Sequence, residues 1–217
     1  MKILSQSIFE TSKITGEIDD QKPQYQSVNF QFSQIEQFGG EFIQFLKLRK
    51  KVFVDGLGWN LANFDSLELD QFDNPTAYYL VITDIDGRVV AGTRFAPITN
   101  QYGALGSMSF EVSSGNLGAI PKDILSNQYL ISDNWEATRL VIHPELVLRE
   151  RKKCLSLLIV ELIKAVNNHG GRAIVTLSPT SLKRLVMTNK INVSQISESY
   201  TCKEDLRKYA SFLISVD

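Results

Sequence analysis

The sequence predicts an α+β fold, a three-layer α/β/α sandwich in which helices cover both faces of a central mixed, mostly antiparallel sheet. Apolar residues recur at helical spacing in two segments, one beginning at residue 35 and one at residues 155–166. Short apolar runs bounded by turn residues lie between these segments and after the second one, and such runs predict strands. Helices that are interspersed with hairpin-connected strands favour a layered α+β arrangement.

The composition is typical of a globular domain. The chain has 217 residues, of which 43% are hydrophobic and 22% are charged. We therefore expect a single domain over residues 1–217. The formal net charge of −1 gives no overall attraction to nucleic acid, so a charged partner would have to meet a local patch.

The sequence also bounds the location of the protein. The first residues contain no continuous apolar segment of a signal peptide, and no run reaches the roughly 18 apolar residues that a membrane helix needs. Cys154 and Cys202 have neither metal-ligand nor disulfide-framework spacing, so we expect both to be free thiols. These features favour a soluble cytoplasmic protein without membrane or nucleic-acid partners, and a monomer is the favoured state.

The first half of the chain predicts a helix and a hairpin. Residues 1–30 are polar and lack a sustained period, which is typical of a loose arm or one peripheral strand. Apolar residues at helical spacing then predict an amphipathic helix over about residues 35–56. The clearest hairpin follows, with strands at residues 78–83 and 88–97 around a tight turn at 84–87.

The second half predicts further strands around a long helix. Residues 135–142 form an apolar strand, and the helix at residues 155–166 stops at the glycines that follow His169, where a glycine can adopt the left-handed cap. The remaining predicted elements are a buried strand at 173–178, a short helix at 181–188, and strands at 193–197 and 211–216.

Residue spacing argues against a metal site in the acidic segment ELDQFD. Glu68, Asp70 and Asp73 lack the glycine and the final glutamate of a calcium-binding loop. His143 and His169 are not at zinc-ligand spacing, so we expect no metal. Glycine-rich phosphate loops and the G-x-S-x-G serine motif are also missing from the sequence, which leaves phosphate-driven and serine-nucleophile mechanisms without support.

Several charged residues interrupt otherwise apolar elements. Arg49 lies on the apolar face of the first predicted helix, Arg94 lies within a predicted strand, and Glu136 and Arg139 lie at the start of another. Burying such charges is unfavourable unless they are paired. They either meet at a buried site or form ordinary surface ion pairs, and periodicity alone leaves both alternatives open.

Five segments form an ordered set: LRKKVFVDGLGWN (48–60), ELDQFD (68–73), YYLVI (78–82), GTRFAP (92–97) and WEATRLVI (135–142). Together they resemble the acyl-homoserine-lactone synthases, the bacterial autoinducer synthases of quorum sensing. The resemblance spans about residues 35–145 and is weaker toward the C-terminus. The signature residues of the family fall on Arg49, Phe53, Trp59, Asp70, Asp73, Arg94, Phe110, Glu136 and Arg139.

The resemblance implies an acetyltransferase-like (GNAT-like) fold and an acyltransferase that makes N-acyl-L-homoserine lactones. S-adenosylmethionine would supply the amine as a co-substrate, and no cofactor is implied. The acyl group would come from a thioester of an acyl carrier protein or, in some members, of coenzyme A. Lactone closure would then release methylthioadenosine.

The resemblance also implies residue roles. S-adenosylmethionine carries a sulfonium, an ammonium and a carboxylate, which require aromatic faces or anions and a cation. The residues that would bind it are Arg49, Phe53, Trp59, Asp70, Asp73, Arg94 and Phe110. The catalytic residues would be Glu136, Arg139, Asp70 and Arg94, with Glu136 as the candidate general base. Asp70 could equally pair with an arginine and hold the shape of the site, and Glu68 is expected to face solvent.

The acyl chain is expected in an apolar pocket formed by Val175, Leu155, Leu158 and Leu185. In the family, a residue early in the strand at 173–178 helps to sort acyl chains by their third carbon. That position aligns with Val175 instead of a hydroxyl-bearing threonine, which favours an unsubstituted chain. A shift of one residue would place Thr176 there.

A group of cations at the start of the long helix forms a basic patch. Its members, with two cations from a later segment, are Arg149, Arg151, Lys152, Lys153, Lys183 and Arg184. Acyl carrier proteins are acidic, so this patch is a candidate docking site. The alternative is an ordinary solvated helix N-terminus, although cations there oppose the helix dipole.

Two other functions are compatible with parts of the sequence. A GNAT-type acyl-CoA N-acyltransferase that acts on another amine would need a glycine-rich pyrophosphate loop before the long helix, and LVLRERKKC has no glycine. A non-catalytic module that binds an acyl carrier protein or S-adenosylmethionine would be expected to lack Glu136, Arg94 or Asp70, and all three are present. A synthase is therefore favoured.

Overall fold

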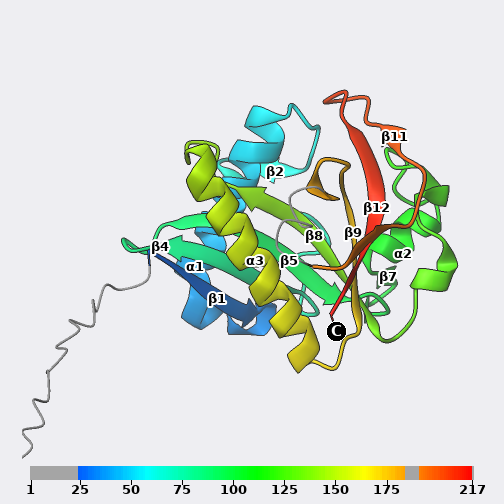
Figure 1. Cartoon of the computed structure of the whole chain (residues 1–217), viewed down its shortest axis with the longest axis horizontal. Helices are drawn as coiled ribbons and strands as arrows, with labels where there is room; N and C mark the ends of the chain where they lie inside the picture. Colours follow the sequence, from blue (N-terminus) through cyan, green and yellow to red (C-terminus); the bar gives the residue numbers. More distant parts are fainter. Residues whose placement is uncertain (1–23, 184–190, 217) are drawn as a thin grey trace, which may run out of the picture.

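A twisted sheet forms the centre of the molecule in the computed structural model, which describes residues 24–183 and 191–216 (Figure 1). Every strand pair in this sheet is antiparallel except β8 with β9. In spatial order the strands are β1 (Tyr25–Gln31), β4 (Tyr78–Asp84), β5 (Val89–Pro97), β8 (Asn134–Ile142), β9 (Ala173–Pro179), β12 (Lys208–Ser215) and β10 (Val193–Gln195), with β11 (Tyr200–Thr201) also paired to β12.

Two long helices cover opposite faces of this sheet. α1 (Ile35–Arg49) packs on one face and α3 (Leu148–Asn168) crosses the other, as Figure 1 shows. Successive residues of a strand point to opposite faces, so β4 places Tyr79 in the core under α1 and Leu80 in the core under α3. The predicted three-layer α+β arrangement, with a mixed and mostly antiparallel sheet, is confirmed.

Short elements connect these layers. α1 continues into a wider π-helical segment, Lys50–Gly56, and a third helix, α2, spans Met108–Ser113. Two small hairpins lie outside the main sheet, β2 (Asn63–Phe64) with β3 (Leu67–Glu68), and β6 (Gln101–Tyr102) with β7 (Leu105–Gly106). Single 3₁₀ turns occupy Phe32–Gln34, Lys122–Ile124 and Asn127–Tyr129.

The predicted elements correspond closely to the observed ones. The hairpin of β4 and β5 is confirmed, with Gly87 at a φ of 77° in its turn. Residues 25–31 of the polar N-terminal segment form β1, which is the peripheral strand that was one of the two alternatives. The short helix predicted at residues 181–188 lies largely outside the described residues.

The sheet opens between its two halves, and this opening positions the site. β8 and β9 pair only between Asn134–Glu136 and Ala173–Val175, after which no pairing joins them. The register of β5 with β8 also shifts between Gly92 and Arg94, opposite Arg139, whose φ is 57°. Such a bulge bends a strand and redirects its side chains. The residues beyond the paired segments of both strands line a cavity.

Across the described ranges, no helix combines the length and the apolar character required to cross a bilayer.

Candidate functional site

A cavity of about 660 Å³ lies where β8 and β9 separate. Its walls come from the segment after α1, from the strands β8 and β9, from α2 and the loop that follows it, and from the β11–β12 hairpin. One end carries charged and aromatic residues, and the other is apolar. The charged end contains most of the residues that the sequence singled out.

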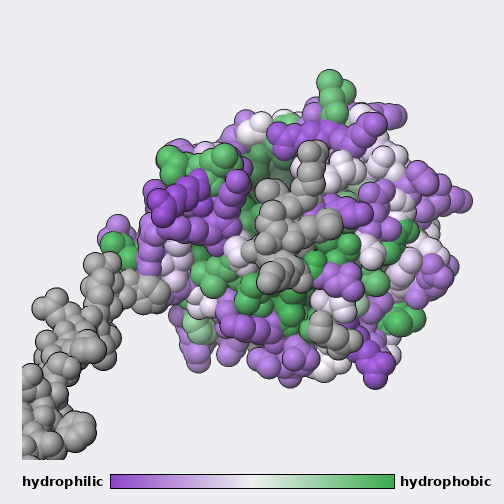
Figure 2. Space-filling model, in the orientation of Figure 1, coloured by the Kyte–Doolittle hydropathy of each residue, from purple (hydrophilic) through white to green (hydrophobic). Residues whose placement is uncertain are grey.

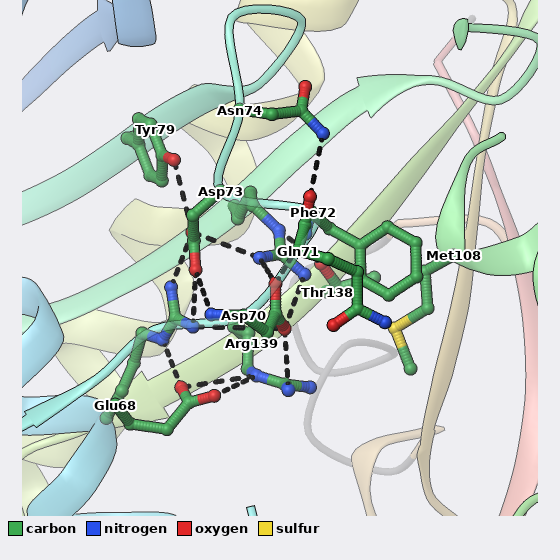
Figure 3. Close-up of polar contacts among 12 residues, drawn as sticks. Glu68, Asp70, Gln71, Phe72, Asp73, Asn74, Tyr79, Met108, Thr138 and Arg139 are labelled. Carbon is green, nitrogen blue, oxygen red and sulfur yellow. Dashed lines mark hydrogen bonds and ion pairs between the residues drawn. The ribbon is translucent and has the colours of Figure 1, made fainter. Parts of the chain in front are cut away.

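Three arginines and three carboxylates form a closed network at this end (Figure 3). Each arginine lies within 3.2 Å of two of the carboxylates, and Arg49 also lies 4.0 Å from Asp70. The Arg49 guanidinium lies 2.5 Å from Glu68 and 2.8 Å from Asp73, that of Arg94 lies 2.5 Å from Asp70 and 3.0 Å from Asp73, and that of Arg139 lies 2.7 Å from Asp70 and 3.2 Å from Glu68. Charges therefore balance within the network, as burial requires.

Glu68 is a member of this network, and the expectation that it faces solvent is wrong. Its side chain is 0% exposed and accepts hydrogen bonds from Nε of both Arg49 and Arg139. Glu68 and Asp70 are two residues apart in an extended segment, so their side chains point to the same side. This two-residue spacing is the signal in the sequence that Glu68 joins the site. If Glu68 faced solvent, Asp70 and Asp73 alone could not provide enough anionic partners for Arg49 and Arg139.

The network presents only part of itself to the cavity. Asp70 and Arg139 line the cavity, whereas Arg49, Arg94 and Asp73 lie behind them. Burial alone would raise the pKa of Asp70, but the guanidinium groups of Arg94 and Arg139 hold the pKa below the ordinary value. The pKa of Asp73 is likewise well below its ordinary value, because Arg94 and Arg49 outweigh the effect of burial.

This arrangement suits small charged ligands better than a metal ion. Every carboxylate of the network already accepts hydrogen bonds from arginines. Within residues 24–183 and 191–216, no cluster of three or more His, Cys, Asp or Glu side chains is placed to hold a metal ion.

An aromatic wall adjoins the charged residues. The rings of Phe53 and Trp59 stack with centroids 5.0 Å apart and an interplanar angle of 11°. The guanidinium of Arg139 lies over the Phe53 ring, 5.7 Å from its centroid, in a cation–π contact. The structure therefore brings seven predicted residues to one end of the cavity: Phe53, Trp59, Asp70 and Arg139 in its wall, and Arg49, Asp73 and Arg94 behind it.

Glu136 is buried beside the cavity instead of lining it. It is 4% exposed, and its two carboxylate oxygens accept hydrogen bonds from the backbone N–H groups of Met108 at 3.1 Å and Ser109 at 2.7 Å. These groups belong to the first turn of α2, where the helix dipole favours an anion. Burial nevertheless raises the pKa of Glu136, and the N–H groups only partly oppose this effect.

Phe110 is not brought to the aromatic wall. It projects from α2 with 44% of its surface exposed and borders a second hollow that also contains Ile98 and Leu130. Sequence spacing could not place this side chain, because the loop before α2 determines which face of the short helix meets the cavity.

The apolar end of the cavity differs in part from the predicted pocket. Val175 and Leu155 line it, but Leu158 lies in the core between α3 and the sheet, and Leu185 lies outside the described residues. The hydroxyls of Thr176 and Ser178 lie 3.1 Å apart on the same cavity wall. The remaining apolar wall, which the sequence did not single out, comes from Val112, Leu117, Ile120, Ile124 and Leu125.

The predicted basic patch lies on the first turns of α3. Arg149, Arg151, Lys152 and Lys153 are exposed there, and Figure 2 shows hydrophilic residues gathered over this end of the helix. Arg151 also reaches the cavity, and Lys153 pairs with Glu150 at 3.1 Å. Lys183 is half-buried, and Arg184 lies outside the described residues.

Comparison with known proteins gives a consistent picture. An acyl-homoserine-lactone synthase of Acinetobacter nosocomialis is 30% identical over 148 residues, which cover 68% of this chain and 78% of that protein. One of Vibrio anguillarum is 37% identical over 62 residues, covering 29% of this chain and 32% of that protein.

Solved structures share the fold at low identity. BjaI, a CoA-dependent acyl-homoserine lactone synthase solved with SAM and isopentyl-CoA, is 18% identical with a TM-score of 0.67, over 89% of this chain and 84% of BjaI. An acyl-CoA N-acyltransferase from Pseudomonas aeruginosa is 13% identical with a TM-score of 0.55, over 87% of this chain and 98% of that chain. The acetyltransferase-like fold is thereby confirmed.

The family model described as autoinducer synthase matches residues 35–215. This range contains the whole charged network, the aromatic wall, Glu136 and almost all of the described strands. The chain belongs to the autoinducer synthase family.

Proposed function

We propose that the protein synthesises N-acyl-L-homoserine lactones for quorum sensing, by transferring an acyl group from a thioester to the amine of S-adenosylmethionine. Two observations together carry this proposal. The chain belongs to the autoinducer synthase family, and the charged end of its cavity presents an anion, a cation and an aromatic wall, namely Asp70, Arg139 and the stacked Phe53 and Trp59.

These groups match the charges of S-adenosylmethionine. Asp70 is ionised and faces the cavity, so it can accept hydrogen bonds from the substrate ammonium. Arg139 can pair with the substrate carboxylate, and the faces of Phe53 and Trp59 can meet the sulfonium. The other predicted ligands of this substrate, Arg49, Asp73 and Arg94, act on it through Asp70 and Arg139, because they hold these two in place from behind.

Acyl transfer requires the amine to lose a proton before it attacks. Glu136 is the proposed general base, and its raised pKa brings its basicity nearer to that of the amine. Because Glu136 is buried, it takes the proton through a water molecule or after a local movement that exposes its carboxylate to the cavity. The amine nitrogen then bonds to the thioester carbonyl carbon, and collapse of the tetrahedral intermediate breaks the carbon–sulfur bond. The departing thiolate takes up the proton that the attacking nitrogen gives up, which leaves a neutral amide and a free thiol.

Lactone closure uses only groups of the substrate. The carboxylate oxygen attacks the γ-carbon, the bond from that carbon to the sulfonium breaks, and the bonding pair leaves with neutral methylthioadenosine. Holding the carboxylate near Arg139 supplies the positioning that such a cyclisation needs. The reaction therefore requires no metal or redox cofactor.

The acyl donor is proposed to approach along the N-terminal end of α3. The exposed cations Arg149, Arg151, Lys152 and Lys153 suit an acidic acyl carrier protein, and coenzyme A is the alternative donor. The acyl chain would extend between Leu155 and Val175 toward the apolar wall. Val175 favours an unsubstituted third carbon, whereas the neighbouring hydroxyl of Thr176 would favour a polar substituent. Both proposed substrates belong to the cytoplasm, where we place the reaction.

Mass spectrometry of the purified protein tests this proposal. With S-adenosylmethionine and a panel of acyl-CoA and acyl-carrier thioesters, we expect products that give the homoserine-lactone fragment, together with equimolar methylthioadenosine. A matched reaction without S-adenosylmethionine is the control. Folded protein that forms no lactone with any thioester would overturn the proposal, and acylation of an added unrelated amine instead would indicate a general N-acyltransferase.

A further inference from the structure

The turn between β11 and β12 reaches across the cavity to the segment that follows α1. Figure 1 shows this turn near the chain that precedes β2. Two carboxylates of the turn accept hydrogen bonds from N–H groups of consecutive residues in that segment. Asp205 accepts a hydrogen bond from Nε1 of Trp59 at 3.2 Å, and Glu204 accepts one from the backbone N–H of Asn60 at 3.3 Å.

Asp205 is itself held by its own hairpin. One carboxylate oxygen accepts the backbone N–H of Arg207 at 3.1 Å, which fixes the side chain relative to the turn. The other oxygen accepts the hydroxyl of Tyr209 at 2.6 Å in addition to the Trp59 indole. The carboxylate is thus oriented by β12 before it meets a residue that is 146 positions away in the sequence.

The indole N–H is the single polar group of a tryptophan side chain. The stacking of Trp59 on Phe53 restrains the plane of its ring but leaves rotation within that plane, and the hydrogen bond to Asp205 restricts this rotation. The ring of Tyr209 also contacts Trp59, with the two centroids 5.9 Å apart. Asp205 does not line the cavity, whereas Trp59, Phe53 and Tyr209 do.

We infer that Asp205 is a positioning residue for S-adenosylmethionine, which acts by orienting the Trp59 indole through its N–H group. The kinetic part of this inference rests on the proposed function. It assigns to the C-terminal hairpin a part in binding the amino substrate, in addition to any part in enclosing the acyl chain. The Trp59 ring would contact S-adenosylmethionine equally in the ground state and in the transition state. Loss of its orientation should therefore raise KM and leave kcat nearly unchanged.

The first experiment varies S-adenosylmethionine at saturating thioester. Asp205→Ala is expected to raise KM about fivefold and to change kcat less than about twofold. Asp205→Ser retains an acceptor for the backbone of the turn but is too short to reach the indole, so it should raise KM by the same factor. This second variant allows the measurement even if the alanine variant does not fold. Asp205→Asn keeps one acceptor oxygen, which can serve either the Arg207 N–H or the indole but not both, so its KM should lie between those of the wild type and Asp205→Ala.

Asp86→Ala is the matched control, because it removes a carboxylate from the exposed turn between β4 and β5. It should leave KM unchanged. A double-mutant cycle separates positioning from general stabilisation. In a Trp59→Phe background, Asp205→Ala should change KM less than about twofold. An equal fivefold rise in both backgrounds, or an unchanged KM in the single variants, would overturn the inference.

Fluorescence tests the same contact without any turnover. The chain has two tryptophans, so Trp135→Phe leaves Trp59 as the sole emitter. In that background Asp205→Ala should shift the emission maximum, and Asp205→Asn should shift it less. If the wild-type protein forms no lactone, the proposed function fails, and the emission spectra still decide whether Asp205 orients Trp59. Unchanged spectra would overturn the inference independently of activity.

Discussion

At the scale of single residues, Glu68 shows how strongly the six charges of the network depend on one another. Replacing it with glutamine leaves three arginines facing two carboxylates in a region that excludes water. Removing one partner of a buried ion pair typically destabilises a protein by about 3–5 kcal/mol. We expect Glu68→Gln to lower the free energy of unfolding by about this amount, as measured by urea denaturation, and to abolish activity.

Glu145→Gln is the matched control for that variant. Glu145 pairs with Lys51, but its side chain is 66% exposed, and solvent screens such exposed ion pairs so that they add little stability. Glu145→Gln should therefore leave the free energy of unfolding nearly unchanged, whereas Glu68→Gln should lower it. Equal small effects would mean that the network tolerates an unpaired arginine.

A second prediction at this scale concerns the pH dependence of Glu136. Burial raises its pKa, so kcat/KM should increase with pH along a limb that lies above the ordinary glutamate pKa of about 4.3. Glu136→Gln should remove this limb and reduce kcat by about 10²–10⁴-fold. Persistence of the same limb in the glutamine variant would assign it to another group, such as the substrate amine.

The sequence predicted the charged site better than its individual contacts. Arg49, Arg94 and Arg139 stood out because each interrupts an apolar element, and all three are buried in one network. Pairwise partners could not be read in advance, since the paired residues are 19 to 71 positions apart. The prediction that Glu68 faces solvent is wrong for this reason, although its two-residue spacing from Asp70 favours the same side of the segment.

At the scale of elements, the start of α3 carries the basic patch, and charge reversal tests whether it docks a carrier protein. Arg149→Glu combined with Lys152→Glu should reduce kcat/KM for an acyl-carrier thioester about tenfold at low salt. The reduction should shrink as salt is added, because the charges are exposed and screened. Turnover of a small acyl thioester without a carrier should change little.

Lys47→Glu is the control for that variant, because Lys47 is exposed on α1, which covers the opposite face of the sheet. It should leave turnover of the carrier thioester unchanged. Equal losses with carrier-bound and small thioesters would show that the patch acts inside the cavity and does not recognise the carrier.

The periodicity of apolar residues predicted the regular helices and strands of the three layers. It did not predict the places where these elements deviate from regular geometry. The helix over residues 35–56 was predicted as one element, but its last turns widen into a π-helix, which the apolar spacing does not distinguish. The strand at residues 173–178 was predicted, while its parallel pairing with β8 and the later separation of the two strands were not. Both depend on contacts between distant segments, and this separation creates the cavity.

At the scale of the whole molecule, the charged network links α1, β3, β5 and β8, so its ionisation affects global stability. The pKa values of Asp70 and Asp73 are lowered in the folded state, whereas in the unfolded chain an aspartate titrates near about 3.9. As the pH falls through this value, the unfolded state therefore takes up protons before the folded state does. Stability that is fully present above about pH 4 is lost below it.

Urea denaturation between pH 7 and pH 2.5 measures this loss as a decrease in the free energy of unfolding. Asp73→Asn should be less stable than the wild type at pH 7, because it leaves Arg49 and Arg94 with fewer anionic partners. Below pH 4 its stability should depend less on pH, since one carboxyl group with a lowered pKa has been removed.

Asp86→Asn, in an exposed turn, is the control and should keep the wild-type dependence of stability on pH. Glu136 has a raised pKa and contributes with the opposite sign, so it cannot account for a loss of stability in acid. Parallel curves for Asp73→Asn and the wild type would mean that the network does not govern acid unfolding.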